Sequence, residues 1–338
     1  MSKERIAVLD GWRGIAILLV LFDHLQLAFA NSYHYIRPWT ETGRHGVTIF
    51  FVLSGYLITS KLLSEEAISL KRFYIRRVFR LMPVAWTYLI VLILLTRLTH
   101  VPLTSFSEIR ACLLFYRNFL TPLNYGLASH FWSLSVEEQF YLVWPALLLV
   151  FGVERCRWIA VFGACAGGIY KLTHWNDNFQ STQTQLHADA ILIGCLLAMT
   201  LSDPALRRVF QKWSKWLVVP AFITMLFCML RFHDLSPLSE SISIAALIGA
   251  CVLSPASFAS RVLSFRPLTW TGVVSYSIYV WQEPFMQIKG HYQIFFLCVI
   301  MPVVILVSHY CIERPLTQYG ARLARSRQAQ QTCYATNP

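Results

Sequence analysis

Residues 9–30 read LDGWRGIAILLVLFDHLQLAFA, and this stretch decides the fold class. From Gly14 onward the side chains are apolar over about the length that crosses a hydrocarbon core as a helix, roughly 20 residues. Arg13, directly before this apolar run, and Asp23 and His24 within it carry ionisable groups. Such groups are costly inside a bilayer and usually functional there. The stretch therefore predicts a membrane-spanning helix that carries chemistry inside the membrane.

The spacing of Arg13 and His24 is informative. Eleven steps of about 100° return to the same helix face, roughly 16 Å along the axis. One face then offers a fixed cation near one end and a titratable base deep inside. In the structural alternative, Arg13 reaches the interface and His24 hydrogen-bonds a neighbouring carbonyl. No small-residue cleavage site follows, so we expect this segment to remain a span and not to be removed as a signal peptide.

Composition extends the prediction to the whole chain. Of 338 residues, 56% are hydrophobic and only 14% are charged, whereas a soluble domain has about 25% charged residues. We therefore predict an all-α polytopic membrane protein, a bundle of about ten transmembrane helices. The predicted spans are residues 14–30, 46–63, 83–98, 136–153, 158–172, 186–201, 216–230, 242–258, 273–286 and 292–312.

The basic residues predict the orientation. Most of the 29 Lys and Arg residues fall on one side when the N-terminus is placed in the cytoplasm. This asymmetry is typical of cytoplasmic loops, and an even number of spans puts both termini inside. Residues 1–315 are expected to form the transmembrane domain and 316–338 a polar, poorly ordered cytoplasmic tail. Because the net charge of +12 is divided among several inner segments, it does not indicate a nucleic-acid partner.

The segment between the second and third predicted spans is rich in arginine. On a helix, Arg72, Arg76 and Arg80 form one basic stripe, with Arg77 beside it. One interpretation is an interfacial helix that holds anionic lipid headgroups, each cation contributing about 1 kcal/mol. The other is a cytoplasmic site for a phosphorylated cofactor, since Arg binds phosphate through two parallel hydrogen bonds. The stripe alone leaves both open.

Residues 131–145, FWSLSVEEQFYLVWP, enter the membrane from the predicted outer face. An acidic mouth lined by aromatic side chains suits a sugar or a polyol. The candidate substrate-binding residues are Trp132, Ser133, Glu137, Glu138 and Tyr141. Helix capping is the alternative: Ser133 or Ser135 caps a helix and the two carboxylates lie in its first turn, where they favourably meet the helix dipole.

Together these stretches resemble the membrane acyltransferase 3 family. The matching blocks occur in the family's order and cover most of the chain. They are residues 9–16 with the Arg-x10-His continuation to His24, then 46–58, 73–83, 132–145, 189–194, 275–281 and 312–315. Two positions differ from the family's pattern. His187 stands where Arg is frequent, and Gln282 stands where His is common; Gln forms hydrogen bonds but does not titrate.

The resemblance implies an O-acyltransferase of a bacterial-type cytoplasmic membrane. Such an enzyme moves an acyl group, by default acetyl, from cytoplasmic acyl-CoA to a hydroxyl of an envelope carbohydrate or a similar acceptor, and we expect no metal. On this interpretation Arg72, Arg76, Arg77 and Arg80 bind the CoA phosphates, and the pantetheine arm threads between helices. His24 removes the acceptor proton, since its unperturbed pKa of about 6.5 lies near working pH. Arg13 positions the donor or stabilises charge, and Asp23 or Asp10 tunes the base.

Several points stay open. Direct transfer is favoured over a covalent intermediate because neither Ser54 nor Ser135 has an evident adjacent base. Some longer family members carry an extracytoplasmic hydrolase-like domain that this sequence does not show, so the bundle is expected to act alone or with another protein. The acceptor is left among lipopolysaccharide O-antigen, exopolysaccharide, a lipid-linked oligosaccharide and a secondary metabolite.

Two other classes of function remain. One is a transporter or flippase of a lipid-linked glycan, with Arg13, His24 and Asp189 along the pathway. Transporters are often built from inverted repeats, and we find no repeat between the two halves of this sequence. The other is a membrane component that binds glycan or acyl-CoA without turnover.

Overall fold

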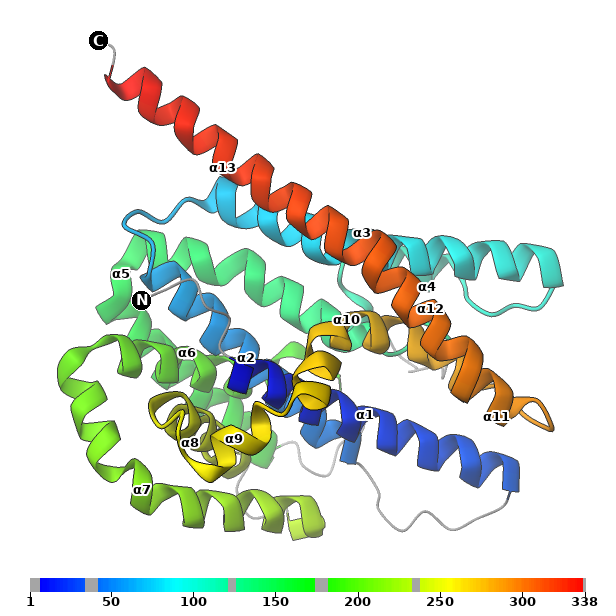
Figure 1. Ribbon diagram of the computed structural model, residues 1–338, viewed down its shortest axis with the longest axis horizontal. Helices are drawn as coiled ribbons and strands as arrows, with labels where there is room; N and C mark the ends of the chain where they lie inside the picture. The colour runs from blue at the N-terminus through cyan, green and yellow to red at the C-terminus, as the bar shows by residue number, and fades with distance from the viewer. Residues whose placement is uncertain (1–6, 34–41, 121–125, 174–181, 233–237, 337–338) are drawn as a thin grey trace. The chain divides into compact units, whose positions relative to one another are not determined.

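The computed structural model describes residues 7–33, 42–120, 126–173, 182–232 and 238–336 (Figure 1). These residues form helices and connecting turns without any strand, which confirms the all-α prediction. Five helices are long and apolar enough to cross a membrane: Ala7–Ala30, Thr42–Leu63, Leu70–Thr99, Pro204–Leu230 and Gln293–Arg325. Ala188–Ser202 and Ser239–Leu253 are apolar but shorter. The integral-membrane class is therefore supported, whereas a bundle of ten spans remains a prediction.

The chain forms two compact units, the first of which comprises residues 1–66 and 132–275. It contains α1 (Ala7–Tyr33), α2 (Thr42–Leu63), nearly all of α5 (Phe131–Thr173), α6 (Ala188–Ser202), α7 (Pro204–Phe227) with the π-helical segment Cys228–Phe232, α8 (Ser239–Leu253), α9 (Phe258–Leu263) and the first half of α10 (Arg266–Met286). Helix α2 packs on α1 and α6, and α7 packs on α8.

Two glycines bring α2 and α6 into backbone contact. A Cβ on Gly55 would lie 1.9 Å from the Ile191 carbonyl oxygen, and one on Gly194 would lie 2.1 Å from the Val52 carbonyl oxygen. Small residues at helix interfaces permit this close approach inside a membrane, where van der Waals packing drives association. The α2–α6 pair is therefore the tightly packed centre of unit 1.

Helix α5 corresponds to two predicted spans, 136–153 and 158–172. Gly152 has φ 73° and ψ 173°, so the helix is interrupted there and continues in a new direction. A side chain disfavours this backbone region, which explains a glycine at the joint. The predicted break between the two spans is thus a single residue and not a loop.

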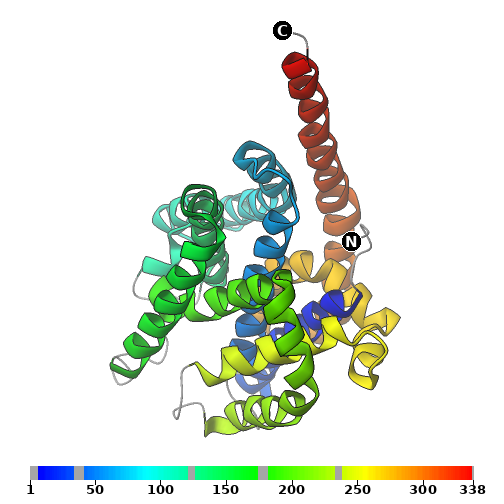
Figure 2. The same cartoon turned by 90° about the vertical axis from the view of Figure 1, so that its left-hand side faces the viewer.

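The second unit comprises residues 67–131 and 276–338. It contains α3 (Leu70–Thr99), α4 (Phe106–Leu113), the 3₁₀ turn Arg117–Phe119, the second half of α10, α11 (Gln293–Phe295), the π-helical segment Phe296–Ile300, α12 (Met301–Val307), the π-helical segment Ser308–Glu313 and α13 (Arg314–Thr336). The segments from α11 to α13 follow one another as one long helix in both views (Figures 1 and 2).

The long C-terminal helix packs along α3 (Figure 1). The rings of Phe79 and Tyr319 lie 5.4 Å apart, edge to face. Because α13 extends to Thr336, the expectation of a poorly ordered tail is wrong for residues 316–336, which are helical. A domain boundary at residue 315 and a cytoplasmic position for the tail remain predictions.

Candidate functional site

Helix α1 carries the predicted base and its companion cation. Since α1 is helical from Ala7 to Tyr33, Arg13 and His24 lie on one face, roughly 16 Å apart along the axis. Both side chains are half-buried. The predicted spacing is retained in the fold, while the chemical roles of the two residues stay predictions.

The first turn of α2 packs against Asp23. A Cβ on Gly43 would lie 3.1 Å from Asp23 Cβ and 3.2 Å from its Oδ2. Two residues further along α2, His45 Nδ1 lies 2.8 Å from Glu240 Oε1 of α8. His45 is buried, and the Glu240 side chain is only 14% exposed. Sequence analysis did not identify this His45–Glu240 pair.

A buried ion pair links three other helices of unit 1. Asp189 of α6 is completely buried, and its Oδ1 lies 2.6 Å from Lys171 Nζ of α5. Its Oδ2 accepts a 3.1 Å hydrogen bond from Ser241 Oγ of α8. A carboxylate inside a membrane protein needs such partners, because an unpaired buried charge is very costly. No sequence motif identified Lys171 as this partner. The sequence indicated only that a buried Asp189 would need a partner.

The first turns of α5 meet α2 through a cluster of three hydroxyl and carboxyl groups. Ser54 Oγ donates a hydrogen bond to Glu137 Oε1. The Tyr141 hydroxyl lies 3.0 Å from Ser54 Oγ and 2.5 Å from Glu137 Oε1, so it donates to either. Ser54 and Tyr141 are buried and Glu137 is half-buried. The inference that Ser54 lacks an adjacent base is therefore wrong, because helix packing brings a carboxylate from a distant segment to its hydroxyl.

An aromatic group lies near this cluster. The Trp132 ring is 4.8 Å from His187 and 6.3 Å from Phe51, and the Phe51 and His187 rings are 5.6 Å apart. Trp132 and His187 are half-buried. Phe51 precedes Ser54 by three residues on α2, and Trp132 precedes Glu137 by five on α5. The aromatic and acidic components of the predicted mouth are thus brought together on two adjacent helices.

The capping explanation of the acidic stretch is wrong. Helix α5 begins at Phe131, so Ser133 and Ser135 lie inside it and are buried. Glu137 and the half-buried Glu138 lie beyond the first turn, where the dipole of the N-terminus has little effect. The helix begins two residues before the nearest expected cap.

In unit 2 the arginine stripe forms the first turns of α3. Ser69 caps this helix by accepting a hydrogen bond from the Arg72 N–H, so the helix begins at Leu70, long before the predicted start of the span at residue 83. Pro83 lies inside the helix. The stripe residues are half-buried; they are Arg72, Arg76, Arg77 and Arg80. The basic segment is therefore continuous with the apolar part of α3, and the choice between lipid headgroups and a phosphorylated cofactor stays open.

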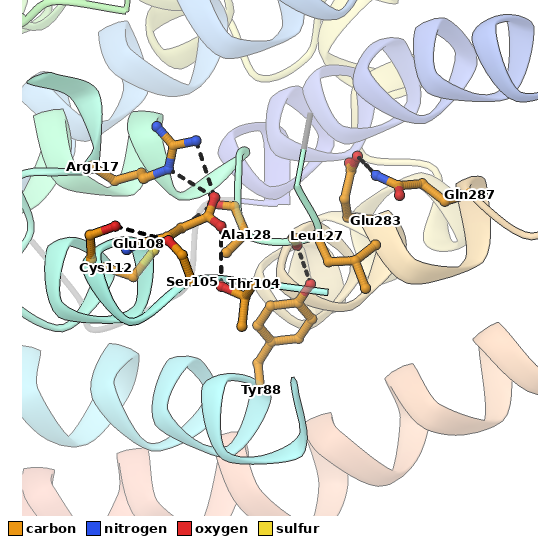
Figure 3. A network of polar contacts seen from close by, with 11 residues as sticks. Tyr88, Thr104, Ser105, Glu108, Cys112, Arg117, Leu127, Ala128, Glu283 and Gln287 are labelled. Carbon is orange, nitrogen blue, oxygen red and sulfur yellow. Dashed lines mark hydrogen bonds and ion pairs between the residues drawn. The ribbon is translucent and has the colours of Figure 1, made fainter. Parts of the chain in front are cut away.

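Unit 2 also contains a buried network that sequence analysis missed (Figure 3). Glu108 of α4 forms an ion pair with Arg117, with Oε1 3.1 Å from both Nε and Nη2. Thr104 donates to the other Glu108 oxygen at 3.1 Å. The Tyr88 hydroxyl of α3 donates to the Leu127 carbonyl, as Figure 3 shows. These contacts hold in place the described parts of the segment that follows α3 within unit 2.

Within unit 2, the second half of α10 contacts α3 at two points. The Tyr276 hydroxyl donates to the Leu81 carbonyl at 2.5 Å, and the Trp281 ring lies 5.3 Å from the Tyr88 ring. The residue after Trp281, Gln282, is completely buried.

The C-terminal helix contributes a second buried polar group to unit 2. Glu313 Oε2 accepts a 2.7 Å hydrogen bond from Ser277 Oγ and lies 2.9 Å from His309 Nδ1. All three residues are buried, and the two on the C-terminal helix lie in its π-helical segment. Such segments occur often at functional sites. Sequence analysis treated residues 312–315 only as a matching block.

Comparisons with known proteins agree with this arrangement of motifs. A family model described as an acyltransferase domain matches residues 6–312. The chain is 29% identical to the peptidoglycan O-acetyltransferase OatA of Listeria monocytogenes over 85% of this chain and 50% of that protein. It is also 29% identical to the O-acetyltransferase OatA of Staphylococcus aureus, over 87% of this chain and 52% of the relative. The chain thus spans about half the length of these relatives. No solved structure matches it.

Proposed function

This chain belongs to the acyltransferase family whose domain covers residues 6–312, and from that premise we propose that it is an integral-membrane O-acetyltransferase. It moves an acetyl group from cytoplasmic acetyl-CoA to a hydroxyl of a cell-envelope carbohydrate. The observation that carries the proposal is the family match over nearly the whole chain, together with relatives that are themselves named O-acetyltransferases. The relatives' names favour this function over a transporter or an inert binding component.

The donor docks through its phosphates on Arg72, Arg76, Arg77 and Arg80. Guanidinium groups suit this role because each can donate two parallel hydrogen bonds to a phosphate. Their half-buried position at the start of α3 supports the proposal, because a partly shielded charge interacts more strongly than a fully solvated one. Acetyl-CoA supplies the activated thioester.

The transfer uses His24 as general base and Arg13 as electrostatic partner. His24 takes the proton of the acceptor hydroxyl as its oxygen attacks the acetyl carbonyl carbon. A C–O bond forms, the C–S bond breaks, and the departing CoA sulfur receives the proton from His24. Arg13 stabilises the negative charge that develops on the carbonyl oxygen, an effect of roughly 3–4 kcal/mol for comparable oxyanion contacts. Asp23, the residue before His24, is the carboxylate that we propose to tune this base.

The acceptor binds at the mouth formed by the first turns of α5 and by α2. Trp132 and His187 offer ring faces, and Glu137 offers a carboxylate that accepts hydrogen bonds from hydroxyl groups. Two relatives of this chain are named for acetylation, one of them of peptidoglycan. A glycan with free hydroxyls is therefore the acceptor class that we propose.

Purified full-length protein in lipid nanodiscs tests the proposal. It is incubated with acetyl-CoA labelled on the acetyl group and with chitotetraose as a soluble glycan probe. We expect labelled acetyl on the oligosaccharide, detected by mass spectrometry, and free CoA thiol in equal amount. Movement of a glycan across proteoliposomes without any acetyl transfer would instead support the transporter.

A further inference from the structure

The first half of α7 in unit 1 carries an exposed basic face. Arg208, Lys212 and Lys215 are exposed and are separated by four and then three residues, so they lie on one face of the helix. Arg207 is exposed beside them. Residues 204–219 contain these four cations and no acidic residue. We call Arg208, Lys212 and Lys215 the α7 basic face.

The opposite side of the same turns packs on unit 1. Ser214 is buried, and a Cβ on Gly249 of α8 would lie 2.7 Å from Phe210 Cζ. Phe210 and Ser214 both lie roughly 160° around the helix from Lys212. The α7 basic face therefore points away from the packed interior of unit 1.

The carboxylate that directly precedes α7 does not neutralise this face. Asp203 caps the helix, since its Oδ1 accepts hydrogen bonds from the backbone N–H groups of Ala205 and Leu206. Its Oδ2 lies 3.5 Å from Arg157 Nη2 of α5. Because Asp203 is already engaged by the helix end and by another cation, the charge of the α7 basic face is left for an external partner.

Two tryptophans border the α7 basic face. Trp213 and Trp216 are 54% and 76% exposed, and Lys212 Nζ lies 5.8 Å from the centre of the Trp213 ring. Tryptophan is enriched where a membrane protein meets the headgroup layer, since its ring is apolar and its N–H is polar. Cations beside exposed indole rings are thus typical of a surface that meets lipid headgroups.

The length of the helix places these residues at the membrane surface. The apolar helix Pro204–Leu230 has 27 residues, so it is roughly 40 Å long, whereas the hydrocarbon core is about 30 Å thick. The part from Trp213 to Leu230 alone is roughly 27 Å long and fills that core. The turns with Arg208 and Lys212 then project into the headgroup layer, and the long side chain of Lys215 reaches it.

We propose that the α7 basic face binds the phosphate headgroup of an anionic phospholipid, whose acyl chains lie along Trp213 and Trp216. An anionic headgroup is favoured over a zwitterionic one because three neighbouring cations attract net negative charge. A soluble anion would have no use for the exposed indole rings, so the two features together indicate a lipid. This inference uses only the membrane-spanning character of α7 and does not depend on the proposed acetyl transfer.

Position-specific photocrosslinking tests the proposal. The full-length protein carries Trp216→p-benzoylphenylalanine and is placed in nanodiscs that contain equal amounts of phosphatidylglycerol and phosphatidylcholine with the same acyl chains. After illumination, mass spectrometry measures the ratio of the two lipids attached to α7. We expect at least a fivefold excess of phosphatidylglycerol, since one cation near a membrane surface contributes about that factor.

A second crosslinker position reports the bulk lipid. Leu142 of α5 is 65% exposed, and no basic residue lies within ten positions of it on either side. With Leu142→p-benzoylphenylalanine the two lipids should be attached in nearly equal amounts. An unchanged yield at this position in each charge variant also shows that the variant is folded in the bilayer.

Charge variants locate the site. Joint replacement of Arg208→Gln, Lys212→Gln and Lys215→Gln should bring the ratio at position 216 close to one. Lys212→Gln alone should lower it, whereas Lys289→Gln, which removes an exposed lysine from unit 2, should not.

Three outcomes would overturn the proposal. A ratio near one before any charge is removed would leave the α7 basic face to an acidic protein partner instead of a lipid. An equally high ratio after the triple replacement would show that these cations do not select the lipid. A loss with Lys289→Gln equal to that with Lys212→Gln would reduce the effect to net charge.

Discussion

His24 is a half-buried residue of α1. Asp23 precedes it and touches the start of α2, and the same turn of α2 carries His45, which pairs with Glu240. Histidine suits the proposed role of proton acceptor, because the unperturbed pKa of its side chain is near neutral.

Replacing His24 by Ala is expected to abolish acetyl transfer while the protein stays folded in the membrane. The substitution removes the proton acceptor but keeps a helix-forming residue in α1. General-base catalysis contributes roughly 10²–10⁴-fold, so the rate with chitotetraose should fall at least a hundredfold. A folded variant that keeps more than about a tenth of the rate would exclude His24 as the base.

Variants of Glu137 and Glu138 distinguish a role in glycan binding from a role in protein stability. We expect Glu137→Gln to raise the KM for the glycan, because the amide replaces a carboxylate that accepts from Ser54 and Tyr141 and from the acceptor. Glu138→Gln, one position along the same helix, is the control and should have a smaller effect. A change in melting temperature with unaltered glycan kinetics for Glu137→Gln would place the acceptor elsewhere.

The Cys112 thiol of α4 should resist alkylation in the folded protein. It is buried, and this burial, aided by the nearby Glu108 carboxylate, raises its pKa from 9.0 to about 12. Since only the thiolate reacts, iodoacetamide at pH 8 should label Cys112 far more slowly when folded than when denatured. The folded rate should still be rising with pH well above 9. Equal rates in both states would contradict this.

At the scale of elements, the contacts between helices determine where the candidate site residues lie. Helices α2 and α6 meet backbone to backbone because Gly55 and Gly194 carry no side chain. This contact fixes the position of Ser54, one residue before Gly55, opposite Glu137 of α5. The Ser54–Glu137 contact therefore depends on the packing of α2 against α6, although α6 contributes no side chain to that contact.

We expect Gly194→Ala to destabilise unit 1. The new methyl group would overlap the Val52 carbonyl, and relieving this overlap requires α2 and α6 to separate, at a cost of about 1–3 kcal/mol. The melting temperature in detergent measures the effect. Gly167→Ala is the milder comparison, because its Cβ would lie 3.3 Å from the Gln185 carbonyl oxygen and needs a much smaller shift, so it should lower the melting temperature less.

On the scale of the whole molecule, the two compact units carry different candidate functions. Unit 1 holds the predicted base on α1 and the acceptor mouth on α2 and α5. Unit 2 holds the arginine stripe on α3 and, on α10 and the C-terminal helix, the buried group of Ser277, His309 and Glu313. Each unit is assembled from two separate parts of the chain, so no single stretch of sequence contains either group of residues.

The predicted orientation is testable with reporter fusions. Fusions within residues 31–44 and 173–185 should report an outer location, and a fusion after the last residue should report the cytoplasm, because basic residues concentrate in the intervening inner segments. Residues 34–41 and 174–181 of these loops lie outside the described residues. A cytoplasmic report from either loop would refute the topology and the even number of spans.

The sequence by itself determined the class, the family and the local spacings. Long apolar stretches require helices in a bilayer, since every backbone polar group must be satisfied within the segment. The Arg13–His24 interval and the stripe from Arg72 to Arg80 follow from helical periodicity alone. These are local properties, and the continuous helices α1 and α3 retain them.

Only the tertiary structure decided which distant groups meet. Glu137 with Ser54, Lys171 with Asp189 and Glu108 with Arg117 are pairs whose partners lie on different helices or turns. The start of α5 also differed from the expectation, because Ser133 and Ser135 are both plausible caps and packing determines where the helix begins. The physical reason is the same in each case. A buried charge or hydroxyl requires some partner, but periodicity does not specify which one, since that choice depends on how the helices pack.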